Sequence, residues 1–163
     1  MCGNDDTDVQ DVGVTVSGVG RFRAGALRRA RARRRLTLRD LAALSGVSAV
    51  TLHSWETGAR NPSPRSLAKV ATALELEIGD LVPVTESKVV LEDLRVQQGL
   101  SQRDAAVRIG MGPTLFREIE TGHKAPNVTQ RAALVKLHEL DEDEFDVIWQ
   151  RTRALLIRRL RGD

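Results

Sequence analysis

The chain has 163 residues, of which 41% are hydrophobic, and this composition excludes a wholly disordered protein. A single cysteine, Cys2, excludes an intrachain disulfide framework and a zinc site built from several cysteines. The net charge of +3 is segregated along the chain: residues 1–20 carry −4, residues 21–85 carry +7, residues 86–146 carry −4 and residues 147–163 carry +4. A basic block of this size favours a polyanionic partner such as nucleic acid.

The first twenty residues are acidic and rich in glycine, which predicts a flexible tail or at most a weak edge strand. The next segment, 24–35, is rich in alanine, arginine and leucine and is expected to be helical. Glycine and proline then separate a series of shorter segments with helical character, and Pro83 ends the series. These segments are 38–45, 49–56, 65–74 and 78–82. Because none of this block has the pattern of a strand, the predicted fold is all-α.

An internal repeat is the most informative feature of the sequence. A shift of 64 residues aligns 36–81 with 100–145 without a gap, and 12 of the 46 positions are identical. The identities include the glycines and the proline that break the helices, where backbone geometry is most demanding. We therefore expect two copies of one five-helix domain, joined by a linker near 83–88. The expected parts are a tail (1–20), a first repeat (21–83), a second repeat (84–146) and a C-terminal helix extension (147–163).

Residues 36–58 of the first repeat have the spacing of a helix-turn-helix. Gly46 supplies a positive φ at the turn, and Ser48 can cap the second helix. Leu52 and Trp55 of that helix face inward, which leaves small residues facing outward. A helix held in this way can enter the major groove of B-DNA, which is about 12 Å wide.

The sequence LTLRDLAALSGVSAVTLHSWETGARNPSPRSLAKVATALELEIGDL, within residues 27–82, closely resembles the phage-repressor-like helix-turn-helix domains of the Cro/C1 (XRE) family of bacterial regulators. Residues 91–146 resemble the same family less closely. They keep the segments LSQRDAA and IETG, but they carry Gly112 at the cap position and Pro113 early in the second helix of the motif.

The resemblance implies DNA contacts in the first repeat. Base-edge positions of the family match Ala49, Val50 and Ser54, with His53 beside them, and phosphate positions match Ser48 and the loop 59–61. Leu38 stands where the family often has a phosphate-binding glutamine, so Thr37 or Arg39 is expected to supply that contact. The complete candidate set is Thr37, Arg39, Ser48, Ala49, Val50, Thr51, His53, Ser54, Arg60 and Asn61.

The same positions of the second repeat form a possible second DNA-binding set. Its members are Gln102, Arg103, Thr114, Arg117, Glu118 and Lys124. Arginine can bind guanine with two hydrogen bonds and glutamate can accept from cytosine N4. Glu118 and the local charge of −4 nevertheless weigh against DNA contact by this repeat.

Other polar residues have structural interpretations. The resemblance implies salt bridges between Arg31 and Glu56 and between Arg95 and Glu120. The three histidines do not cluster with other ligands at metal spacing, so we expect no metal and no cofactor. The chain also lacks a nucleophile–base constellation and a phosphate-binding glycine loop, so we expect no enzymatic activity.

The C-terminal segment departs from the family, because apolar residues recur at helical spacing along FDVIWQRTRALLIRRLRG. Two interpretations stay open: this stripe (145–160) docks within its own chain, or it packs on a second chain and makes a homodimer.

The function expected from the sequence is sequence-specific binding of double-stranded DNA by a transcriptional regulator, most simply a repressor, acting in the cytoplasm on the bacterial nucleoid. No apolar run approaches a membrane span, so no membrane partner is expected. The alternative is a protein-interaction module, of the antitoxin or sigma-binding type, in which the second repeat binds protein or dimerises. Because the outward residues of the two repeats differ, a monomer on an asymmetric site is expected beside the homodimer.

Overall fold

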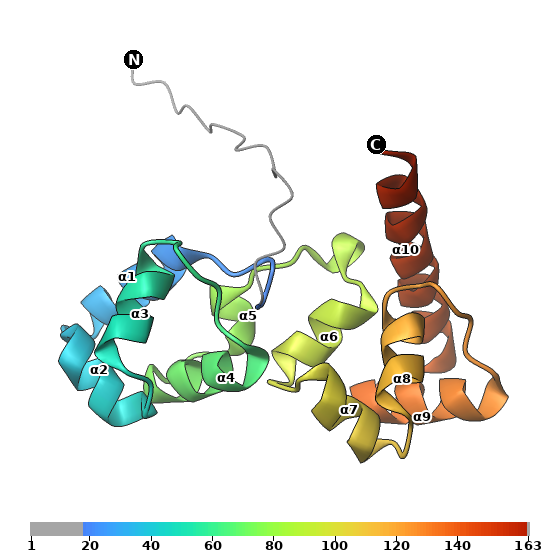
Figure 1. The fold of residues 1–163 in the computed structure, drawn as a ribbon, viewed down its shortest axis with the longest axis horizontal. Helices are drawn as coiled ribbons and strands as arrows, with labels where there is room; N and C mark the ends of the chain where they lie inside the picture. The colour runs from blue at the N-terminus through green and yellow to red at the C-terminus, as the bar shows by residue number, and fades with distance from the viewer. Residues whose placement is uncertain (1–17, 163) are drawn as a thin grey trace.

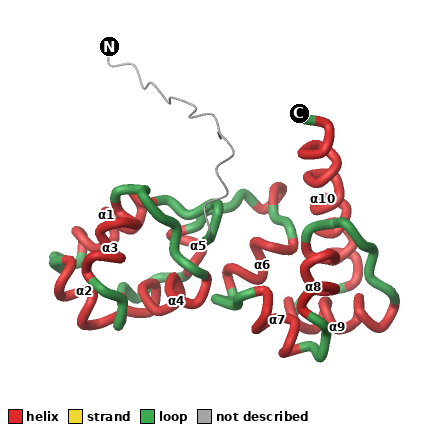
Figure 2. Tube along the Cα trace, viewed as in Figure 1, coloured by secondary structure: helices red, strands yellow, loops and turns green. Residues whose placement is uncertain are grey.

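The computed structural model describes residues 18–162, which form ten α-helices, one short 3-10 helix and no strand within that range. The predicted all-α fold is confirmed. Figures 1 and 2 show two helical units side by side along the long axis, one built from α1–α5 and the other from α6–α10. The bounds are α1 Ala24–Arg33, α2 Leu38–Ser45, α3 Ala49–Glu56, α4 Pro64–Ala73, α5 Ile78–Leu81, η1 Glu86–Lys88, α6 Leu91–Gln97, α7 Gln102–Arg108, α8 Pro113–Glu120, α9 Val128–His138 and α10 Glu142–Arg161.

The helix starts follow from capping side chains. Thr37 begins α2 with a capping box, in which its side chain accepts from the Asp40 amide and Asp40 accepts from the Thr37 amide. Ser101 and Asp104 form the same box at the start of α7. The second repeat loses the equivalent of the Ser48 cap, because Gly112 precedes α8 and has no side chain to offer.

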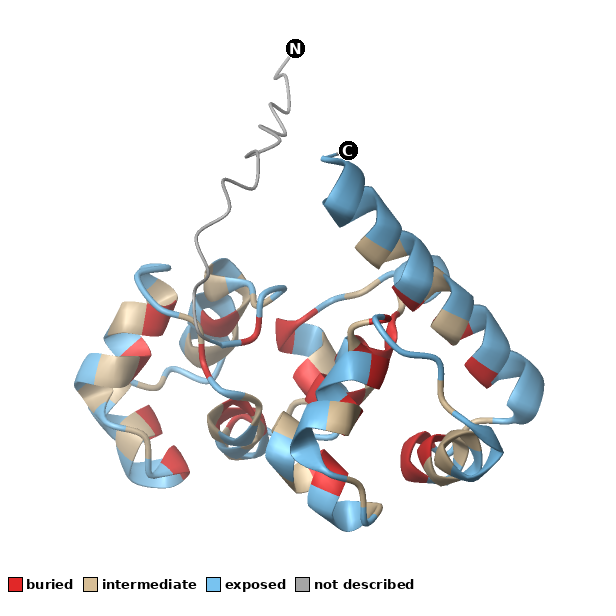
Figure 3. Ribbon diagram, turned by 45° about the vertical axis from the view of Figure 1, so that its right-hand side comes forward, coloured by how far each residue is buried: buried red, intermediate tan, exposed pale blue. Residues whose placement is uncertain are grey.

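Two hydrophobic cores hold the fold together. The first is centred on leucines that are completely buried, among them Leu27, Leu41 and Leu52. The second uses larger side chains, including Phe116 and Phe145. Burial of apolar area at about 25 cal/mol per Å² is the main stabilising term in both cores. Figure 3 shows the buried residues facing inward along most helices.

A buried ion pair joins the first and third helices of each repeat. Arg31 donates from Nε and Nη2 to the two carboxylate oxygens of Glu56, at 2.7 Å each, and from Nη1 to the carbonyl oxygen of Leu36 at 2.8 Å. In the second repeat, Arg95 donates from Nε to Glu120 Oε1 and from Nη1 to the carbonyl oxygen of Leu100 at 2.8 Å. Both pairs expected from the sequence are therefore present.

The fifth helix of the second repeat and the C-terminal extension are one element, α10. No structural break separates residues 146 and 147, where the sequence analysis placed a boundary. The first half of α10 docks within its own chain: Phe145, Ile148 and Thr152 are buried, and the Thr152 hydroxyl accepts from the Leu91 amide at 3.2 Å. The last two turns extend beyond the core, and Leu160 is 74% exposed.

The two units pack directly on each other through α6 and the turn that follows it. Val96 of α6 belongs to the first core, although it lies in the second repeat. Gly99 has a φ of +68°, and a Cβ added to it would lie only 2.8 Å from the Ala68 Cβ of α4. Arg21 pairs with the buried Asp93 across the same junction at 3.2 Å. These contacts fix the orientation of one unit relative to the other.

Replacing Glu56 with alanine is expected to destabilise the fold by about 3 kcal/mol, because it leaves the half-buried Arg31 guanidinium without its partner. Chemical denaturation monitored by circular dichroism measures this. Glu75→Ala is the matched control, since it removes the exposed Arg34–Glu75 pair and should cost at most about 1 kcal/mol. Unchanged stability of the Glu56 variant would contradict the structural role of this pair.

Candidate DNA-binding site

The turn between α2 and α3 is held by local hydrogen bonds. Gly46 adopts a φ of +68°, which favours glycine, and its amide donates to the carbonyl oxygen of Ala42 at 2.9 Å. The Ser45 hydroxyl donates to the carbonyl oxygen of Leu41 and accepts from the Val47 amide. Val47 packs against the first core and sets the angle between the two helices. The motif is therefore a rigid frame for α3.

One face of α3 is anchored and the opposite face is free. Leu52 is fully buried and Trp55 is 4% exposed, whereas Val50 is 81% exposed and His53 is exposed as well. Ala49 and Ser54 are half-buried at the edges of the outward face. Of the base-edge candidates, the structure thus projects Val50 and His53 farthest.

The remaining polar candidates on α3 bond to each other or to the helix. The hydroxyls of Ser48 and Thr51 share a hydrogen bond of 2.8 Å, and the Ser54 hydroxyl donates to the carbonyl oxygen of Thr51 at 2.7 Å. Each hydroxyl oxygen still has acceptor capacity. These side chains are thereby held in defined positions along the edge of α3.

The helix before α3 and the loop after it both carry an exposed cation. Arg39 on α2 and Arg60 in the loop after α3 are exposed, and neither forms a salt bridge with any residue of the described range 18–162. Thr37 differs, because its hydroxyl donates to the Asp40 carboxylate at 2.6 Å. That hydrogen bond holds the pKa of Asp40 below its usual value. Of the two residues expected to replace a phosphate-binding glutamine, Arg39 is therefore the better placed.

The second repeat presents the same frame with different chemistry. Phe116 and Ile119 anchor α8, and Thr114, Arg117 and Glu118 are exposed. Arg103 and Lys124, the other basic candidates of this repeat, are exposed as well. The outward face of α8 thus carries both a cation and an anion.

Gln102 takes a role that the sequence analysis did not anticipate. Its amide donates to Glu120 Oε2 at 2.6 Å and so joins the buried Arg95–Glu120 pair. Burial raises the pKa of Glu120, and the charge and hydrogen bonds of Arg95 oppose that rise. This hydrogen bond uses one of the two N–H donors of the Gln102 amide and ties the side chain to a buried acid.

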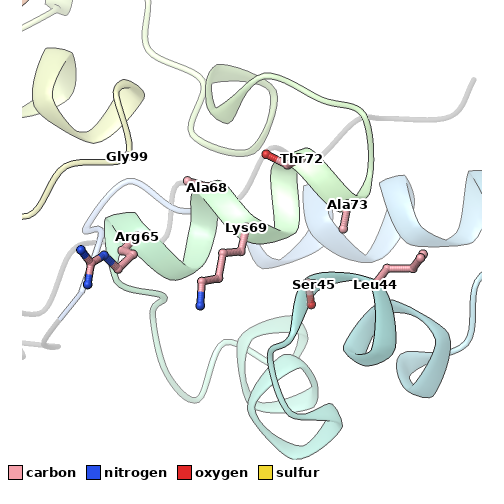
Figure 4. A pocket seen from close by; sticks show the side chains of 8 residues that line it. All are labelled: Leu44, Ser45, Arg65, Ala68, Lys69, Thr72, Ala73 and Gly99. Atoms are coloured by element: carbon pink, nitrogen blue, oxygen red, sulfur yellow. The ribbon is translucent and has the colours of Figure 1, made fainter.

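An open cavity of about 480 Å³ lies between α2 and α4 of the first repeat and reaches Gly99 of the second. Leu44 and Ser45 of α2 line one side, and Arg65 and Lys69 of α4 line another, as Figure 4 shows. Gly99 closes the end near the second repeat.

Other kinds of site are not visible in the part of the chain that the structure describes. Within residues 18–162, no three His, Cys, Asp or Glu side chains lie close enough to hold a metal ion. Burial lowers the pKa of His138 to about 4, so this histidine is neutral at pH 7. None of the described helices has the length and apolar character needed to cross a membrane.

Comparison with known families agrees with this geometry. A family described as Helix-turn-helix, which is of the Cro/C1 type, matches residues 27–81, and a family described as Helix-turn-helix domain matches residues 89–148. The first match spans α1–α5, and the second runs from α6 into α10. No curated protein and no solved structure matches the chain significantly. The chain therefore belongs to the helix-turn-helix DNA-binding transcriptional regulators and carries two such domains in tandem.

Proposed function

We propose that the protein is a repressor that binds a specific double-stranded DNA sequence mainly through its first repeat. One observation carries this proposal: the outward face of α3 exposes no acid, and the neighbouring α2 and the loop after α3 expose the cations Arg39 and Arg60. An acid-free face can approach the electronegative groove, and the neighbouring cations can hold phosphates. The site of action we infer is bacterial DNA in the cytoplasm, with no cofactor and no catalytic step.

In the proposed mechanism, one set of residues positions α3 on the DNA and another set contacts the bases. Arg39, Arg60 and Asn61 hold phosphates and thereby set the register of α3 in the major groove. Ala49 and Val50 offer only apolar contact, which suits the methyl group of thymine, while His53 adds a polar contact to a base edge. An α-helix with its side chains is about 10–12 Å in diameter, so α3 can fit into a major groove that is about 12 Å wide. A protein seated on such an operator excludes polymerase from the same DNA.

The second repeat is proposed to read different bases or none. Arg117 and Thr114 can contact base edges, but Glu118 repels phosphates unless it faces the N4 amino group of a cytosine. Since the packing at Val96 and Gly99 fixes the two units, a chain that uses both helices must bind half-sites of fixed spacing and unlike sequence. We therefore propose an asymmetric recognition site.

A protein partner is the second candidate function, and α10 is the observation that favours it. The first half of α10 already packs against the second core of its own chain. Only the projecting turns can therefore form a homodimer or bind another protein. Those turns carry the half-buried Leu155 and Leu156 and the exposed Ile157 and Leu160. This contact is compatible with DNA binding, because a dimer would present two copies of α3.

Changes in the first repeat are expected to weaken DNA binding more than matched changes in the second. Arg60→Ala should reduce affinity through a lost phosphate contact, and Ser54→Glu should reduce it by about tenfold or more by placing a charge against base edges. Lys124→Ala matches the first change, and Thr114→Glu places the same charge on the outward face of α8, because the position that matches Ser54 already holds Glu118; both should have smaller effects. Fluorescence anisotropy on a duplex selected from a random pool measures all four, and equal losses in both repeats would refute this order.

Affinity should fall steeply with salt concentration. Each phosphate neutralised by an arginine contributes a slope of about −0.9 to the plot of log K against log salt. Several contacts should give a slope of several units, and Arg60→Ala should reduce its magnitude by about one. A flat dependence would support the protein-interaction function instead.

The selected recognition site should be asymmetric. Sequencing of duplexes retained from a random pool gives the site, and analytical ultracentrifugation of the complex gives the number of chains. Arg117→Ala should alter the base preference in only one half of the site. A perfect palindrome that binds two chains and is insensitive to Arg117 and Thr114 would instead make the second repeat a dimerisation domain.

A further inference from the structure

The acidic N-terminal segment joins the folded part of the chain beside the DNA-contact loop. Residues 1–17 contain four aspartates and no lysine or arginine. Val19 is buried, and its amide donates to the carbonyl oxygen of Pro62 at 2.9 Å. Gly18 has a φ of +139° and packs so closely that an added Cβ would lie 2.7 Å from the Asn61 carbonyl oxygen. These contacts fix the root of the acidic segment next to Arg60.

The repeat to which this root belongs also carries exposed cations. Arg39 and Arg60 are exposed and form no salt bridge within residues 18–162. The outward face of α3 carries no acid, and residues 21–85 together carry +7. The opposite charge on residues 1–17 complements this face, as the phosphates of DNA would.

The segment is long enough to cover this face. Asp11 lies seven residues before Gly18 and Asp5 lies thirteen residues before it, so their extended reach is about 25 Å and 45 Å. The helix α3 is about 12 Å long. Because it is tethered this closely, the segment has an effective concentration in the millimolar range at the surface of the first repeat. Even weak ion pairs between the segment and that surface then form in a substantial fraction of the molecules.

We propose that residues 1–17 dock on the DNA-contact face of the first repeat and compete with DNA for Arg39, Arg60 and the outward side of α3. The proposal rests on the DNA-binding function proposed above. The docked segment lowers affinity for DNA of any sequence, because only the uncovered fraction of the protein can bind. Weak, non-specific sites are then occupied less, and only a sequence that α3 reads well retains the protein.

The docking can be tested without DNA, because Cys2 is the single cysteine and lies within the acidic segment. A nitroxide attached to Cys2 of the full chain should broaden the NMR signals of amides at Arg39 and in residues 58–61. Amides in residues 155–161 of α10 should be unaffected. The broadening should disappear in the variant D5N/D6N/D8N/D11N and persist in D5E/D6E/D8E/D11E, which keeps the charge. The proposal would be overturned if no signal is broadened, or if the broadening is the same in the natural chain and in the D5N/D6N/D8N/D11N variant.

Competition can be measured with a fluorescent random-sequence duplex of about 30 base pairs in low salt. The D5N/D6N/D8N/D11N variant should bind this duplex about three- to tenfold more tightly than the natural chain, and the difference should vanish as salt rises. The D5E/D6E/D8E/D11E variant should bind like the natural chain. Equal affinity of all three proteins would overturn the proposal.

The two readouts separate this proposal from the function on which it rests. If all three proteins bind DNA equally and the nitroxide broadens no amide near α3, DNA binding stands and docking of the segment is refuted. If the charge-dependent broadening is present but no protein binds any duplex, docking is supported and the DNA-binding function is refuted.

Discussion

The orientation of α3 depends on the pairing of Arg31 with Glu56 more than on any other polar contact. One guanidinium holds both carboxylate oxygens at the end of α3 and also the carbonyl oxygen of Leu36, just before α2. It therefore ties three helices of the motif at a single point. Buried pairs of this kind add little net stability compared with apolar side chains, but an unpaired member is very unfavourable. Alternative packings that separate the pair are excluded for that reason, and one orientation of α3 is selected.

The second repeat has the equivalent ion pair, and there the pair is more deeply buried. Arg95 and Glu120 are about 5% and 4% exposed, and Gln102 supplies a further hydrogen bond to the acid. The frame is thus retained while the outward face has changed to Thr114, Arg117 and Glu118. The residues that anchor the second helix of the motif differ from those on its outward face. The outward residues can therefore be substituted while the anchoring residues stay the same.

Local signals made the helices predictable, and the resemblance to the Cro/C1 family implied the ion pairs. Ser48, Ser101 and the glycine at position 46 mark helix ends by their own chemistry, and the 64-residue repeat placed Arg95 opposite Glu120 once the first pair was recognised. The contact of Gln102 with Glu120 and the approach of Gly99 to Ala68 could not be found in this way. Both depend on how distant helices pack, which no spacing along the chain specifies. The roles of the candidate DNA contacts remain predictions, because they depend on a partner molecule.

The position of Val96 bears on whether the first repeat can fold as a separate unit. This side chain lies after the linker, yet it completes the core that contains Leu27 and Leu41. A fragment that stops at the linker would therefore leave a hole in its own interior and expose the apolar surface that Val96 covers. The two repeats keep separate cores, but unfolding of α6 would remove Val96 from the first core and expose the apolar surface beside it.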